Sequence, residues 1–113
     1  MAASAYPNLT LGIVAAVVLT QYQAVTAAGA IATAAGNAVG FTQTGAASGQ
    51  RVPVAAGGTA IATASAAIAV GAAVEVVGAA GKVVTKTAGV AIGRALTAAA
   101  ADGDQIEVLV IPN

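Results

Sequence analysis

The sequence contains no histidine and no cysteine. Histidine is the commonest general base and metal ligand, and cysteine is the most nucleophilic of the ordinary side chains, so most catalytic chemistry lacks its usual residues here. The absence of cysteine also excludes disulfide bonds, although it says nothing about the compartment. We therefore predict a protein that is not an enzyme, with no catalytic residues, no cofactor and no metal site.

Charged side chains are scarce as well. They make up 7% of the 113 residues against 58% hydrophobic residues, four basic and four acidic groups give a net charge of zero, and Met1 to Gln50 carries none. A nucleic-acid-binding protein would need a basic excess, so no nucleic-acid partner is expected. A chain of this length is one domain of marginal stability, and its surplus apolar surface predicts burial against partners.

The apolar runs are too short or too interrupted to cross a membrane. Leu9 to Leu19 is about half of the roughly 20 residues that a spanning helix needs, and no lysine or arginine flanks it. The uncharged stretch from Val52 to Val74 is broken by Pro53 and by paired glycines. No membrane partner is therefore predicted.

The C-terminal third has the clearest pattern, which is typical of strand, turn and strand. Val90 to Leu96 is apolar, Asp102-Gly103-Asp104 is a strong turn signal, and from Gln105 onward apolar and polar residues alternate as in a half-buried strand. The two aspartates could in principle bind Ca²⁺, but an oxygen site needs six to eight ligands, so turn chemistry is the preferred interpretation. Leu109 and Ile111 break the alternation, which predicts that another part of the fold or another chain covers them.

The rest of the chain predicts further short strands. They are Ala38 to Thr44, Arg51 to Ala55 and the two arms of a hairpin around Gly78 to Gly81, with Ala24 to Ala35 as loop and short strand. Pro53 should confine its strand to a sheet edge. We predict an all-β fold, a small barrel or sandwich of short strands with Gly-rich turns, plus an extended N-terminal arm.

The domain organisation follows from the same reading. Residues 1–20 are expected to form the arm and a first apolar segment, and residues 21–113 a single small β domain. Leu9 to Leu19 could be a strand pair or a short buried helix, whereas Met1 to Leu11 favours an arm laid along a neighbouring molecule.

A weak internal echo runs through the sequence. Ala38-Val39-Gly40 to Val54 parallels Ala91-Ile92-Gly93 to Val108. This similarity is either a true repeat or a chance result of a composition rich in Ala, Gly and Val.

The closing segment Gly-Val-Ala-Ile-Gly-Arg-Ala-Leu-Thr-Ala, with Asp-Gly-Asp-Gln-Ile-Glu-Val-Leu-Val after it, resembles a family of tailed-phage capsid cement (head decoration) proteins. The small-residue turns from Ala30 to Gly40 and from Ala67 to Val74 are similar too, so the resemblance runs from about Gln23 to Pro112. It implies a structural protein on the outer surface of the virion capsid. The implied partners are the major capsid protein and other copies of itself, as a homotrimer or a dimer.

Two function classes remain open at this stage. The first is capsid cement that bridges neighbouring major capsid subunits and stabilises the shell, and the second is a self-associating Ala/Thr-rich surface, fibre or ice-binding module. Arginine suits carboxylate pairing at interfaces, although a solvated surface arginine is the simpler account of either arginine. The candidate interface residues are Tyr6, Pro7, Leu9, Leu11, Arg51, Arg94, Leu109 and Ile111.

Overall fold

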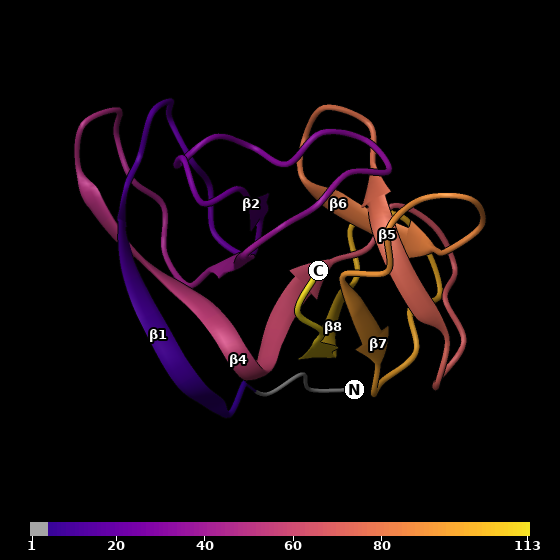
Figure 1. Cartoon of the computed structure of the whole chain (residues 1–113). Helices are drawn as coiled ribbons and strands as arrows, with labels where there is room; N and C mark the ends of the chain where they lie inside the picture. Colours follow the sequence, from indigo (N-terminus) through magenta and orange to yellow (C-terminus); the bar gives the residue numbers. More distant parts are fainter. Residues whose placement is uncertain (1–4) are drawn as a thin grey trace.

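The computed structural model describes residues 5–113, and residues 1–4 lie outside the described residues. Within residues 5–113 the chain forms eight strands and no helix (Figure 1). In chain order these are β1 (Pro7–Val14), β2 (Ala24–Val25), β3 (Gly40–Thr42), β4 (Arg51–Thr63), β5 (Ala73–Val77), β6 (Lys82–Thr85), β7 (Gly93–Ala95) and β8 (Gln105–Val110). The predicted all-β class is confirmed.

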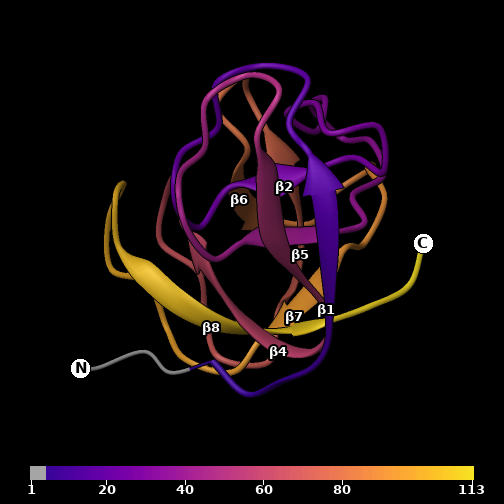
Figure 2. The ribbon, with the colours of Figure 1, turned by 90° about the vertical axis from the view of Figure 1, so that its left-hand side faces the viewer.

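The strands join in one barrel-like sheet with the order β2-β3-β4-β8-β7-β5-β6, and β1 pairs with β4 outside this path. All named strand pairs are antiparallel, and the molecule measures 35 × 26 × 23 Å. Figure 1 shows β4 running through both sides of the molecule, with β1 and β2 on one side and β5 to β8 on the other. Figure 2 shows β1 and β4 side by side, with β8 crossing below.

The prediction that Pro53 would confine a short strand to a sheet edge is wrong. β4 is 13 residues long and pairs with β1, β3 and β8. The ladder between β3 and β4 ends at the pair Thr42–Val54, and beyond it the carbonyl of Pro53 still accepts a hydrogen bond of 3.0 Å from the Gln43 N–H. The missing N–H of proline therefore falls where that ladder has already ended, which makes it tolerable in a central strand.

The arm expected for Met1 to Leu11 is contradicted from Pro7 onward, and its first four residues lie outside the described residues. From Pro7 onward the chain is β1, which pairs along its length with Arg51 to Gly58 of the same molecule, with a register irregularity near Leu9. The choice left open for Leu9 to Leu19 resolves as a single strand followed by a bend and a bridge from Leu19 to Ala46.

The local predictions for the second half are confirmed. β5 and β6 form a hairpin around Gly78–Gly81, and β7 and β8 flank the predicted turn. In that turn Gly103 has φ +91°, and the Asp104 carboxylate accepts hydrogen bonds from the N–H groups of Ala100 and Ala101 at 2.7 and 3.1 Å. Turn chemistry therefore accounts for Asp104 without a ligand.

The internal echo is a structural repeat. We call residues 7–55 the first lobe and residues 56–110 the second lobe. Each of four residue pairs in the first lobe has a counterpart in the second. Val14–Arg51 corresponds to Thr63–Gln105, and Ile13–Val52 corresponds to Ala62–Ile106. Ala24–Phe41 corresponds to Ala73–Arg94, and the bridge Leu19–Ala46 corresponds to the bridge Ile68–Ala99. Since register fixes which side chains share a face, the two lobes place equivalent positions on equivalent surfaces.

Each lobe has its own core built from equivalent positions. In the first lobe the fully buried members are Ala15, Leu19, Val25, Val52 and Val54, and their counterparts in the second lobe are Ala64, Ile68, Val74, Ile106 and Val108. The period-two alternation of β8 places Ile106, Val108 and Val110 inside, as the sequence predicts.

A row of three first-lobe residues packs into the core of the second lobe and not into the core of its own lobe. This junction row is Ala24, Phe41 and Ala55, which are register neighbours across β2, β3 and β4. The hairpin of β5 and β6 lies close against it, since the Ala24 N–H donates to the Gly81 carbonyl at 3.0 Å and the Gln23 amide to the Ala80 carbonyl at 2.8 Å. Phe41, which is 1% exposed, is the largest fully buried side chain within residues 5–113.

Candidate interface

The predicted interface residues fall into two groups on different lobes. The first group surrounds β7 and β8, and the second lies on β1 and the start of β4. The members are Tyr6, Arg94, Leu109 and Ile111 in the first group and Pro7, Leu9, Leu11 and Arg51 in the second. The prediction thus marks two surfaces of one chain and not a single site.

The first group is organised by a row of register neighbours that we call the open row, Ala73, Arg94 and Leu109. It is the second-lobe counterpart of the junction row, but Arg94 is exposed and Leu109 is 42% exposed. Register pairs Leu109 with Thr59 of β4, and Thr59 in turn exchanges hydrogen bonds with the backbone of Tyr6 at 2.7 and 3.2 Å. The structure therefore brings Tyr6, Arg94 and Leu109 together.

Sequence reasoning missed the next row of the same face. Glu107 pairs with Ile61, and its carbonyl accepts a hydrogen bond of 2.8 Å from the N–H of Leu96, which is 41% exposed. Alternation from the buried Ala95 could have indicated Leu96, because neighbours along a strand point to opposite faces. This face therefore presents Leu96, Leu109 and the half-buried Ile61.

Both predicted arginines bond to backbone carbonyls of their own lobe. The Arg94 Nη1 donates to the Gly71 carbonyl at 2.7 Å, and the Arg51 Nη1 donates to the Gly12 carbonyl at 2.8 Å. Neither takes part in an ion pair within residues 5–113. Their guanidinium groups are thus held along the surface, and carboxylate pairing with another chain stays a prediction.

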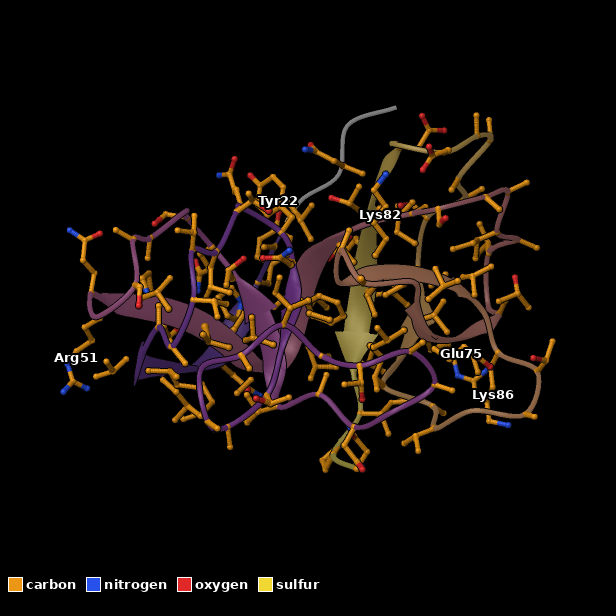
Figure 3. All side chains as sticks on the ribbon, turned by 90° about the horizontal axis from the view of Figure 1, so that it is seen from above. Tyr22, Arg51, Glu75, Lys82 and Lys86 are labelled. Atoms are coloured by element: carbon orange, nitrogen blue, oxygen red, sulfur yellow. The ribbon has the colours of Figure 1, made fainter. Side chains whose placement is uncertain are left out.

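The second group lies at the far end of the first lobe. Leu9 is half exposed, Leu11 is half buried opposite Val54, and Figure 3 shows Arg51 at one end of the long axis of the molecule. Val14, Val17 and Val18, which we did not predict, are exposed on the same lobe. Apolar side chains are therefore exposed on both lobes.

Several of the other acidic and basic groups have partners within residues 5–113. Lys82 and Asp102 form an exposed ion pair at 3.0 Å, which is worth little in water. Glu75, 8% exposed, accepts hydrogen bonds from the N–H groups of Thr87 and Gly89 at 2.6 and 3.1 Å, and these bonds lower the pKa of its carboxyl group. Figure 3 shows Glu75 beside Lys86, at the end of the molecule opposite Arg51.

Residues 5–113 hold no cluster of acidic side chains that could bind a metal ion. Over the same residues, no helix has the length and apolar character to span a bilayer. A small hollow of about 280 Å³ lies where the two lobes meet, lined by Ile31, Ala32, Thr33, Ala34, Gly78 and Ala79. Its lining is almost entirely apolar, so it suits an apolar side chain better than a polar ligand.

Residues 5–113 thus form a helix-free β domain with exposed leucines and valines on both lobes, and exposed apolar side chains of this kind mark surfaces that contact other molecules. The chain belongs to the phage cement protein family, whose model matches residues 8–110. It is therefore a structural phage protein associated with the head. The match begins earlier than the resemblance seen from Gln23 and includes nearly all of β1.

The fold is shared with a solved structure from bacteriophage phi29, the N base of the head fiber gp8.5. The TM-score is 0.71 at 15% sequence identity, and the alignment covers 91% of this chain and 93% of that one. No curated protein matches the chain by sequence.

Proposed function

We propose that this protein binds the outer surface of a phage head and bridges neighbouring major capsid subunits, which stabilises the shell. The observation that carries the proposal is the pair of separate apolar surfaces, one around Leu96 and Leu109 on the second lobe and one around Leu9, Val14 and Val18 on the first. A bridging protein needs two contacts, and exposed apolar patches are typical of interaction sites.

The charge balance supports the same proposal. With zero net charge and few charged side chains, copies of the chain do not repel one another. We propose a homotrimer as the attached form, with a dimer as the alternative, because a closed symmetric oligomer would bury surface that a single small domain leaves exposed. The role is structural and needs no catalytic residue.

Reconstitution on heads tests the proposal. Purified protein is mixed with emptied, undecorated heads, and bound protein is counted after sedimentation. A cement protein saturates at a fixed ratio to the major capsid protein and raises the temperature at which the heads break open.

The outcome also separates the alternative function. Protein that self-associates but never saturates on heads at a fixed ratio would contradict the cement proposal and would favour a fibre or surface module. An electron cryomicroscopy map of the saturated particle would then show whether the density sits outside the shell and spans two capsid subunits.

A further inference from the structure

We propose that a second hollow between the two lobes, with Tyr22 on its wall, is a binding site for one ring of a neutral saccharide. The hollow has a volume of about 270 Å³ and lies where the segment before β2 meets β4 and β6. Thr20, Gln21, Tyr22 and Gln23 line it from the first lobe, and Thr63 and Lys82 line it from the second. Saccharide binding is an activity separate from the attachment to the head proposed above.

The backbone at Tyr22 is strained. Its φ is +62°, in the left-handed region that a bulky L side chain rarely adopts. The equivalent position in the second lobe is Gly71, with φ +88°. The same bond identifies both positions, since the Tyr22 N–H donates to the Thr42 carbonyl at 2.9 Å and the Gly71 N–H donates to the Ala95 carbonyl at 2.7 Å. Glycine suits this turn, so the fold does not explain the tyrosine, and backbone strain of this kind collects at functional sites.

The rest of the segment differs between the lobes in the same way. Four residues separate the equivalent bridge and strand pairs, and they are Thr20-Gln21-Tyr22-Gln23 in the first lobe and Ala69-Val70-Gly71-Ala72 in the second. Gln23 has a structural role, because its amide donates to the Ala80 carbonyl at 2.8 Å. That contact between the lobes does not account for Gln21 and Tyr22, which the second lobe replaces with valine and glycine.

The hollow combines an aromatic ring with hydrogen-bond donors and acceptors. The Gln21 amide is anchored by its bond to the Gln43 carbonyl at 3.0 Å, and the Lys82 ammonium is held by Asp102 at 3.0 Å. Figure 3 shows Tyr22 and Lys82 on the same side of the molecule, near the middle of its long axis. The ammonium donates, the carboxylate beside it accepts, and an amide or a threonine hydroxyl does both.

These groups match the chemistry of a sugar ring. One side of a pyranose presents C–H groups that pack on the face of an aromatic ring, and its edge carries hydroxyl groups that both donate and accept. The charges of Lys82 and Asp102 cancel, so the site favours a neutral ligand over an anion. The volume lies below the usual range of ligand pockets, which limits the occupant to about one ring, at the end or on a branch of a polysaccharide.

Nuclear magnetic resonance titration of the full chain tests the site. The probes are the methyl glycosides of glucose, galactose and N-acetylglucosamine, with the methyl glycoside of glucuronic acid as the charged comparison. At least one neutral glycoside should shift the amide signals of residues 20–23 and of Lys82 in a saturable way, at concentrations up to about 50 mM, which cover millimolar dissociation constants. Saturable shifts with the glucuronide alone would show an anion site, and either that result or no saturable shift at all overturns the proposal.

Tyr22→Gly is the deciding variant, because it removes the aromatic ring and relieves the strained backbone at once. It should raise the dissociation constant of the glycoside by about 10-fold or more, while the melting temperature stays the same or rises. Unchanged binding overturns the proposal. Weakened binding with a melting temperature that falls by more than about 5 °C would show that packing retains the ring, and it also overturns the proposal.

Lys82→Met and Lys86→Met form a matched pair. Both remove an ammonium group and keep an unbranched stem, but Lys82 lines the hollow, whereas Figure 3 shows Lys86 at the end of the molecule opposite Arg51. Lys82→Met should raise the dissociation constant about 3- to 10-fold, which is typical of losing one hydrogen bond, and Lys86→Met should leave it unchanged. Equal effects of the two substitutions would place the saccharide elsewhere and contradict the site.

Discussion

Phe41 and Arg94 occupy the same register position in the two lobes, yet Phe41 is 1% exposed while Arg94 is exposed. The strand pairs around them are equivalent, so local backbone structure does not explain the difference. Packing does: the second lobe covers the first row, whereas the second row is left partly exposed within residues 5–113. At equivalent positions, the residue type therefore depends on what packs against the position and not on the fold of its own lobe.

The largest expected difference lies between these two residues. Phe41→Ala removes a fully buried aromatic ring from the junction and should cost about 3 to 5 kcal/mol of unfolding free energy. Arg94→Ala, the matched change, should alter it by less than about 1 kcal/mol because the side chain is on the surface. Urea denaturation of the dissociated protein measures both, and equal losses would break the comparison.

The second test concerns how closely the lobes approach. Gly81 and Gly78 both have positive φ in the hairpin of β5 and β6, but a Cβ on Gly81 would meet the Ala24 carbonyl oxygen at 3.0 Å, whereas one on Gly78 would meet nothing within 4 Å. We expect Gly78→Ala to cost about 1 kcal/mol from strain alone and Gly81→Ala about 2 to 4 kcal/mol. Thermal unfolding that ranks them in the opposite order would contradict the tight junction.

A smaller difference should separate the equivalent turns. The Asp104 carboxylate accepts two backbone hydrogen bonds, whereas the Gln50 side chain accepts one, from Ala47 at 2.9 Å. Asp104→Ala should therefore cost about 1 to 2 kcal/mol and Gln50→Ala about 0.5 to 1 kcal/mol. Added calcium should not change the melting temperature of the wild-type protein, and a calcium-dependent rise that is absent in Asp104→Ala would contradict the turn interpretation.

The smallest expected effect on stability appears only at acidic pH and only in the second lobe. The position equivalent to Glu75 in the first lobe is Thr26, which has no ionisable side chain. The bonds from Thr87 and Gly89 hold the pKa of the Glu75 carboxyl below its usual 4.5. A lowered folded-state pKa means that this stabilisation is present above pH 4.5 and is lost as the pH falls through the folded-state value. Glu75→Gln should flatten the fall in melting temperature below that pH. A Glu75→Gln protein whose melting temperature falls as steeply in acid as that of the wild type would contradict this role.

The sequence predicted the parts of the fold that depend on neighbours in the chain. The hairpin around Gly78–Gly81 and the alternation of β8 are local, so turn chemistry and period two were enough. The length of β4 was missed because Pro53 is tolerated there for a reason that local sequence does not show. The ladder between β3 and β4 ends at Val54, next to Pro53, and β3 is a separate segment of the chain.

The candidate interface was predicted in part for the same reason. Leu109 was found because it breaks an alternation within one strand, and Arg94 because arginine suits interfaces. Their meeting in one row needs the register between β7 and β8, which no local pattern encodes. The internal echo was visible in the sequence, but the contrast between Phe41 and Arg94 becomes clear only once equivalent pairs are known.

The continuity of β4 has a mechanical consequence. The strand belongs to both lobes, with β1 paired along its first part and β8 along its second. Tension applied between the two lobes is therefore carried by a covalent backbone and not by a hinge. Antiparallel hydrogen bonds run perpendicular to the strands, so a pull along β4 loads the flanking bonds together in shear instead of opening them one after another.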